Sequence, residues 1–203
     1  MKIICIGRNY IDHIKELSNQ KPLNPVVFLK PDSSIIAKNQ NFIIPSFSNE
    51  IHYEVELVIK INKVGKHIDK SFSYKYYDEI GLGIDFTARD IQNNLKEKGH
   101  PWEKSKAFDN SCMVGKFLKK EKLEDISKIE FSLIKNNELV QSGCSNDMLW
   151  KIDELISYVS QYFTLKIGDL IFTGTPSGVS KVESGDILEG YILSNKMFTL
   201  KVK

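Results

Sequence analysis

The chain has 203 residues, of which 41% are hydrophobic and 27% are charged, as in an ordinary globular protein. A chain of this length buries on the order of 70% of its unfolded surface, so we expect a single domain over residues 1–203. The 28 Lys and Arg nearly balance the 26 Asp and Glu, and no basic block is interleaved with aromatic residues, so we expect no nucleic-acid partner.

Cysteine usage and hydropathy indicate the compartment. Cys5, Cys112 and Cys144 are odd in number and widely spaced, which is typical of proteins in a reducing cytoplasm. The opening "MKIICIGRNYIDH" has only a four-residue apolar run, and no later segment approaches the length of a membrane span. We therefore expect a cytoplasmic protein with no membrane partner.

Short strands dominate the hydrophobic pattern along the chain. Three helices interrupt them, and no regular βαβ alternation is visible, which predicts an α+β domain with antiparallel or mixed sheet. The expected strands cover residues 2–6, 26–30, 53–62, 80–85, 129–135, 170–173, 187–193 and 197–202.

Each expected helix has its own signal. Residues 10–18 repeat apolar side chains at helical spacing. Residues 88–98 have a capping-box-like start at Thr87 and Asp90 and stop at Gly99. Residues 147–162 carry an apolar stripe, with Ser145 as the expected cap.

The segment "IHYEVELVIKIN" brings carboxylates together on one strand face. Its period-two pattern places Glu54 and Glu56 roughly 7 Å apart on the side that also carries His52. Asp85, at the end of the apolar run "GLGID", is a third candidate acid. Oxygen-only sets of this kind suit Mg²⁺, Mn²⁺ or Ca²⁺. The alternative from spacing alone is a solvated strand face with Asp85 as a helix cap.

Two further patterns suit acid–base chemistry. His13 and Glu16 lie one helical turn apart, and a carboxylate beside an imidazole fixes its tautomer and makes it a better base. An exposed His–Glu pair is the competing interpretation. Lys106, taken alone, has the features of a surface charge. Cys112 lacks a neighbouring base, so we expect a buried, unreactive thiol.

Six segments occur in an order that resembles the fumarylacetoacetate hydrolase family, and specifically its short acylpyruvase and oxaloacetate-decarboxylase branch. The resemblance runs from Gly7 almost to the C-terminus, and its strength lies in the order of the motifs. They are "GRNYIDHIKEL", "VVFLKPDSS", "HYEVELVIKI", "GIDFTARDIQ", "KGHPWEKSKAFDNS" and "GDLIFTGTPSGV".

The resemblance implies a fold and a metal. The family's catalytic domain is a mixed β-sandwich roll or barrel with a few short helices. Glu54, Glu56 and Asp85 match its three metal-binding carboxylates, which implies Mg²⁺, with Mn²⁺ or Ca²⁺ as substitutes. His52 is then expected outside the ligand shell, because Mg²⁺ rarely takes imidazole.

The same resemblance assigns roles to the other candidates. His13 and Glu16 match a catalytic dyad on a lid that closes over substrate, and Lys106 matches the active-site lysine. Arg89 is expected to be structural, bridging to a nearby carboxylate. Contacts with the substrate are implied for Arg8, Lys30, Gln92 and Thr175.

The reaction expected from the resemblance involves a 2-oxo acid. Hydrolysis of an acylpyruvate, decarboxylation of oxaloacetate and its tautomerisation all pass through an enolate that the metal stabilises. One alternative is an isomerase or decarboxylase of aromatic catabolism, similar to 2-hydroxyhepta-2,4-diene-1,7-dioate isomerases. A second is a non-catalytic metal-binding or small-molecule-binding protein of the same fold. The resemblance also implies a homodimer.

Overall fold

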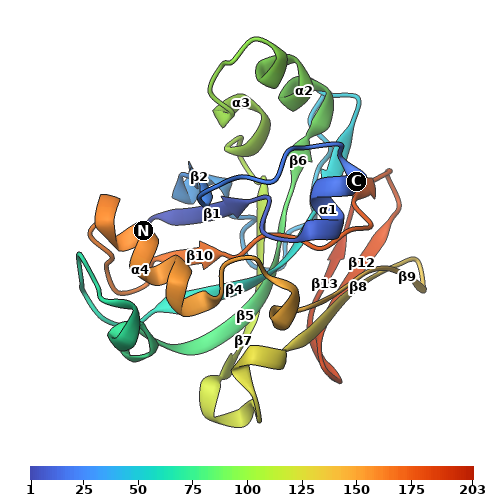
Figure 1. Cartoon of the computed structure of the whole chain (residues 1–203). Helices are drawn as coiled ribbons and strands as arrows, with labels where there is room; N and C mark the ends of the chain where they lie inside the picture. Colours follow the sequence, from blue (N-terminus) through green and yellow to red (C-terminus); the bar gives the residue numbers. More distant parts are fainter.

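The computed structural model describes all 203 residues and contains three β-sheets with four short α-helices around them (Figure 1). The α+β class with mixed sheet is confirmed, and none of the sheets closes into a barrel. The helices are α1 (Ile11–Glu16), α2 (Arg89–Glu97), α3 (Glu103–Lys106) and α4 (Ile152–Tyr162).

The largest sheet has six strands and mixed direction. Its only parallel neighbours are β1 and β10, and every other pair is antiparallel. In spatial order it consists of β2 (Val26–Lys30), β1 (Ile3–Gly7), β10 (Leu170–Phe172), β4 (Val55–Ile61), β5 (Tyr77–Asp85) and β7 (Cys112–Lys119).

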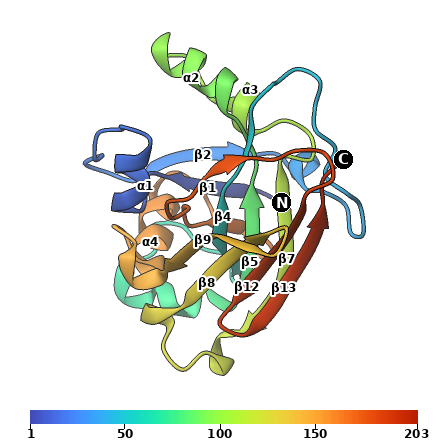
Figure 2. The ribbon, with the colours of Figure 1, turned by 90° about the vertical axis from the view of Figure 1, so that its right-hand side faces the viewer.

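Two smaller sheets complete the β-structure. A four-stranded antiparallel sheet packs its strands β12 and β13 against β5 and β7 of the large sheet, and Figure 2 shows the two layers. A three-stranded sheet lies beside the start of β4. In spatial order the four-stranded sheet consists of β13 (Asn195–Lys201), β12 (Ile187–Ile192), β8 (Glu130–Lys135) and β9 (Glu138–Cys144). The three-stranded sheet consists of β11 (Ser180–Lys181), β3 (Ile51–Tyr53) and β6 (Thr87–Ala88).

Apolar side chains of the strands and of α4 form the main hydrophobic core. The predicted stripe of α4 is buried at Ile152, Leu155, Ile156 and Val159, which confirms the helical spacing found in the sequence. Each buried Leu or Ile contributes roughly 1.5–3 kcal/mol relative to an exposed one, so this stripe fixes α4 to the core. No helix has the length and apolar character required to cross a bilayer.

Several expected boundaries were wrong. The single strand expected at 53–62 is interrupted at Glu54, which lies between β3 and β4. Strands β7 and β9 were not expected, because Gly115 interrupts the hydrophobic pattern of the first and the only buried residue of the second is the polar Gln141. Helix α4 begins at Ile152 and not at residue 147.

The two expected helix caps were also wrong. The Ser145 hydroxyl accepts a hydrogen bond from the Ile129 amide and does not cap α4. Asp90 accepts hydrogen bonds from Ser48 and from the Asn49 amide, while α2 has no side-chain cap. These side chains satisfy distant backbone and hydroxyl groups, a choice that local spacing does not reveal.

Candidate active site

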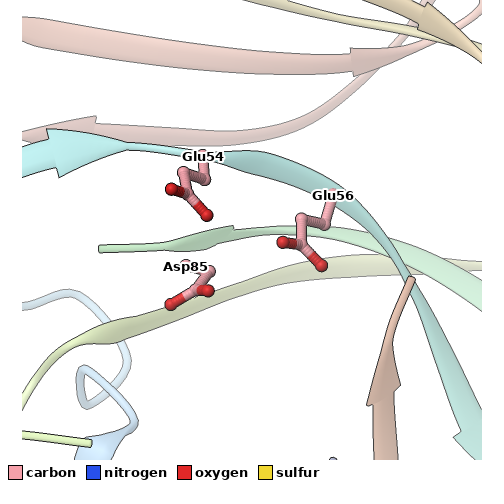
Figure 3. A group of neighbouring side chains, drawn as sticks. All are labelled: Glu54, Glu56 and Asp85. Carbon is pink, nitrogen blue, oxygen red and sulfur yellow. The ribbon is translucent and has the colours of Figure 1, made fainter. Parts of the chain in front are cut away.

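Three buried carboxylates meet at the point where β3, β4 and β5 come together (Figure 3). Glu54 stands at the break between β3 and β4, Glu56 follows on β4, and Asp85 ends β5. Their nearest ligand oxygens lie within 4.8 Å of one another, and the residues are 5%, 2% and 0% exposed. The alternative of a solvated strand face is therefore wrong.

The break at Glu54 is supported by a side chain from another sheet. Gln141, on β9, accepts a hydrogen bond of 3.0 Å from the Val55 amide, which would otherwise be buried without a partner. Its own amide group donates to the Thr175 hydroxyl at 2.9 Å and to the Pro176 carbonyl at 3.0 Å. Gln141 thus ties the interrupted strand to the loop after β10.

Glu54 and Glu56 have opposite electrostatic surroundings. The Lys106 ammonium donates to one oxygen of Glu54 at 2.7 Å, and Arg89 donates to the other oxygen. Burial raises the pKa of Glu54, but these two cations outweigh burial and hold the pKa far below its usual range. Glu56 forms no ion pair and accepts a hydrogen bond of 2.7 Å from the Gly174 amide. Burial and the nearby carboxylates raise the pKa of Glu56.

These carboxylates fit a hard divalent cation. The charge of Asp85 is compensated by two ammonium groups, that of Lys30 at 2.8 Å from Oδ1 and that of Lys106 at 2.6 Å from Oδ2. Glu56 is a carboxylate whose charge no protein cation neutralises by direct contact. An oxygen-only donor set with such unsatisfied negative charge is what Mg²⁺, Mn²⁺ and Ca²⁺ require.

Lys106 is buried in the centre of the site. Its ammonium donates to Glu54, to Asp85 at 2.6 Å and to the Thr87 hydroxyl at 2.6 Å. Burial lowers the pKa of Lys106, but Asp85 and Glu54 outweigh that effect and raise it, so the side chain is a cation at neutral pH. The interpretation of Lys106 as a surface charge is therefore wrong.

Lys30 does not line the cavity as expected. Its side chain is fully buried behind Asp85, with the ammonium 2.8 Å from Asp85 Oδ1 and 2.9 Å from the Ser111 hydroxyl. It also donates to the Lys106 backbone carbonyl. The structure thus places Lys30 as a support for the end of α3, which carries Lys106, and not as a substrate contact.

The His13–Glu16 pair is assembled on α1 above the carboxylates. His13 Nδ1 lies 3.3 Å from Glu16 Oε2, and Glu16 Oε1 accepts a hydrogen bond of 2.9 Å from the Gly178 amide. A proton on Nδ1 toward Glu16 leaves Nε2 as the basic nitrogen. Burial lowers the pKa of His13 despite the opposing effect of Glu54 and Glu16, so the imidazole is neutral at physiological pH.

Helix α2 supplies two of the predicted residues. Arg89 bridges to Glu54, as expected for a structural arginine, and its Nε lies 3.4 Å from His52 Nδ1. The Gln92 side-chain oxygen accepts a hydrogen bond of 2.6 Å from Arg89 while the residue lines the cavity. His52 is not part of the carboxylate cluster.

The glycine-rich loop after β10 holds carboxylates of the protein itself. The amide of Gly174 donates to Glu56 and that of Gly178 to Glu16, so the loop connects the proposed metal ligands to the dyad. Gly174 has a φ of +97°, and an added Cβ would lie 2.7 Å from the Asn9 Cβ, so only glycine fits there. Thr175 lines the cavity as expected.

Most of the predicted site residues surround one small cavity, but Lys30 and Glu16 do not line it. Its volume is about 30 Å³, enough for an ion or about two waters, whereas small-molecule sites span roughly 300–1,000 Å³. A substrate therefore enters only when α1 or the side chains around it move aside. The predicted site residues on its wall are Arg8, His13, Glu54, Glu56, Asp85, Gln92, Lys106 and Thr175.

The sequence interpretation missed two residues that position the site. Gln141 is a single glutamine in a strand without apolar alternation, and no local pattern distinguishes it. Asn9 lies inside "GRNY" and is fully buried, and its side chain donates to the Thr173 carbonyl at 2.7 Å. Its place inside the motif "GRNY" is a sequence signal that could have identified Asn9 as a site residue.

Cys112 is fully buried, and burial raises the pKa of its thiol to about 12, as expected for an unreactive cysteine.

Comparison with known proteins agrees with this geometry. The chain is 39% identical over 201 residues to the oxaloacetate tautomerase YcgM of Escherichia coli strain K12, covering 97% of this chain and 92% of that protein. It is 41% identical over 189 residues to the mitochondrial oxaloacetate decarboxylase of Dictyostelium discoideum, covering 93% and 87%. The solved fumarylpyruvate hydrolase of Pseudomonas aeruginosa, in complex with Mn²⁺ and pyruvate, superposes with a TM-score of 0.93 at 32% identity, covering 100% of this chain and 89% of that one.

The family described as fumarylacetoacetate (FAA) hydrolase, C-terminal, matches residues 2–201, which is nearly the whole chain. Both the fold and the buried carboxylates, dyad and lysine agree with the resemblance seen in the six sequence motifs. The chain belongs to the fumarylacetoacetate hydrolase family.

Proposed function

We propose that this chain is a Mg²⁺-dependent enzyme of small 2-oxo acids that tautomerises or decarboxylates oxaloacetate, hydrolyses acylpyruvates, or does more than one of these. The observation that carries the proposal is the convergence of three buried carboxylates, a neutral His13 and a charged Lys106 on one cavity. The relatives named as oxaloacetate tautomerase and decarboxylase support it.

Glu54, Glu56 and Asp85 would hold the ion. When bound, a divalent cation polarises the 2-oxo group of the substrate and offsets the negative charge that develops there. The oxygen-only ligand set supports Mg²⁺, and a similar structure contains Mn²⁺, so both metals suit the site.

The protein side chains supply the proton transfers. His13 Nε2, with Nδ1 held by Glu16, removes a proton from C3 of oxaloacetate or from a water molecule. Lys106 places a positive charge beside the carboxylates, where it stabilises negative charge on the substrate oxygen. Closure of α1 through the Glu16–Gly178 hydrogen bond excludes bulk water during the reaction.

A substrate panel tests the assignment. Oxaloacetate, acetylpyruvate and fumarylpyruvate are each incubated with the purified protein, with Mg²⁺ and after chelation. We expect turnover of at least one substrate that disappears on chelation and returns with Mg²⁺ or Mn²⁺. Turnover that survives complete chelation, or no turnover of any 2-oxo acid, would contradict the proposal.

We also propose that the protein is a homodimer. Strand β2 is an edge of the large sheet, and an apolar groove lies between it and α4. Exposed edges and apolar patches of this kind are commonly covered by another protein surface. The groove is lined by Pro25, Val27, Phe28, Leu29, Tyr158, Tyr162 and Phe163.

Light scattering at micromolar concentration should therefore give twice the chain mass of 23.3 kDa. A mass near that of one chain, unchanged up to high micromolar concentration, would show that the protein is a monomer.

A further inference from the structure

The cavity contains more positive charge than the proposed metal ligands neutralise. Four cationic side chains line the cavity. Two of them, Arg89 and Lys106, are already bonded to the carboxylates. The other two, Arg8 and Lys96, form no ion pair with any acidic residue of the chain. A bound divalent cation would add to this positive surplus, which therefore requires a negatively charged ligand.

Lys96 is placed at the cavity by helical geometry. Arg89, Gln92 and Lys96 are spaced i, i+3 and i+7 on α2, so they share the face that lines the cavity. The Lys96 ammonium donates a hydrogen bond of 2.8 Å to Asn19 Oδ1 in the turn after α1. Burial lowers the pKa of Lys96, and the positive charges of Arg8 and Arg89 lower it further.

Lys96 and Arg8 mark the outer end of the cavity. The proposed metal ligands are almost completely buried, whereas Arg8, Asn19 and Lys96 are partly exposed. Arg8 has a φ of +58°, an uncommon backbone conformation for a residue with a side chain, and its guanidinium lies 5.9 Å from the Trp102 ring centroid. Two unpaired cations thus stand at the mouth, opposite the carboxylates at the buried end.

We propose that Lys96, beside Arg8, is the specificity-determining residue that binds the second carboxylate of a dicarboxylic 2-oxo acid. The assignment rests on the proposed function, because it assumes that the 2-oxo acid end of the substrate lies at Glu54, Glu56 and Asp85. A monocarboxylic 2-oxo acid would bind there without using Lys96. The hydrogen bond that the Lys96 ammonium donates to Asn19 would hold it in place until the substrate carboxylate replaces Asn19 as the acceptor.

A matched pair of ligands tests this assignment without turnover. The two ligands are 2-oxoglutarate and 2-oxopentanoate, whose carbon chains have equal length. Only 2-oxoglutarate carries a second, terminal carboxylate. Calorimetry with Mg²⁺ present would measure the Kd of both, and wild type should bind 2-oxoglutarate more tightly. The kinetic counterpart compares kcat/KM for fumarylpyruvate with that for acetylpyruvate.

The key variant is Lys96→Gln, which keeps a donor for Asn19 and removes the charge. We expect a loss of about 10–100-fold in affinity for 2-oxoglutarate, the loss typical of one charge-assisted hydrogen bond, with 2-oxopentanoate within a few-fold of wild type. For fumarylpyruvate the change should appear in KM with kcat preserved. Lys96→Arg should retain much of the preference, and Asn19→Ala should also keep it because the charge remains.

Lys98→Gln is the matched control, because Lys98 is an exposed lysine at the end of the same helix. Equal weakening of both ligands in Lys96→Gln would show that Lys96 only holds α1 in place and would overturn the assignment. A preference that is absent in wild type or unchanged in Lys96→Gln would overturn it as well. A chain that binds 2-oxoglutarate selectively but turns over no substrate would refute the proposed function and leave the role of Lys96 in binding intact.

Discussion

Replacing Glu56 by glutamine is expected to abolish metal binding and all three proposed reactions while leaving the fold intact. Glu56 forms no ion pair, so its neutralisation leaves no buried cation without a partner, and an amide oxygen still accepts the hydrogen bond from Gly174. Neutralising Glu54 would instead weaken contacts with Lys106 and Arg89, a change that typically costs about 3–5 kcal/mol for a buried pair. Glu56 is therefore the cleaner position for this test.

The expected effects have definite sizes. Metal ions typically supply several kcal/mol of catalysis, so kcat/KM should fall by roughly 10³-fold or more for every substrate. In wild type, free Mn²⁺ at about 100 times its Kd should stabilise the fold by about 2.7 kcal/mol and raise Tm by about 5–10 °C. This increase in Tm should be absent in Glu56→Gln.

The control for this experiment is Glu138→Gln, which removes an exposed carboxylate at a hairpin end and should keep both activity and the Mn²⁺ effect on Tm. The assignment of Glu56 as a ligand fails if Glu56→Gln retains the Mn²⁺-dependent increase in Tm.

Removing the dyad is expected to separate the reactions. Glu16→Gln or His13→Ala should lower kcat for acylpyruvate hydrolysis by roughly 10²–10⁴-fold, because hydrolysis requires an activated water. Tautomerisation should also fall, since it consists of proton transfers. Decarboxylation of oxaloacetate needs no water activation and should suffer least. The measurement is kcat of each variant for acylpyruvate hydrolysis and for the two reactions of oxaloacetate, at saturating Mg²⁺.

The pH dependence provides an independent check on His13. A general base must be deprotonated to act, and burial lowers the pKa of His13 from its ordinary value near 6.5. The rate of hydrolysis should therefore stay level through neutral pH and decline only as the pH falls below about 6.5. A decline centred above pH 7 would point to another base.

Asp12→Asn is the matched control for the dyad, because Asp12 is an exposed carboxylate on the same helix and pairs only with Lys15. It should leave hydrolysis unchanged. If Glu16→Gln stays within a few-fold of wild type, a group other than the dyad activates the water.

The elements predicted well were those whose signal is local. The apolar stripe of α4 and the hydrophobic runs of β1, β4 and β5 follow from burial, which imposes a period on the sequence wherever an element packs on the core. Strand β9 was missed because its only buried residue is the polar Gln141, so no alternation of apolar residues marks it. The expected helix caps failed because side chains such as Ser145 bond partners far along the chain.

The sequence by itself determined which chemical groups the site contains. The carboxylates of "HYEVEL" and "GID", the His13–Glu16 spacing and the order of six motifs sufficed to predict a metal-dependent enzyme of 2-oxo acids. Spacing alone left a solvated strand face and an exposed His–Glu pair as alternatives, and the family resemblance carried by the order of the motifs favoured the metal site and the dyad.

Only the tertiary structure decided how those groups are used. It placed Lys30 behind Asp85 and Gln141 at the break beside Glu54, through contacts that span 76 and 86 residues of the chain. It also showed that Lys96 faces the cavity without an acidic partner. Such assignments depend on which charges are buried together and how they are compensated, and neither is encoded in local periodicity.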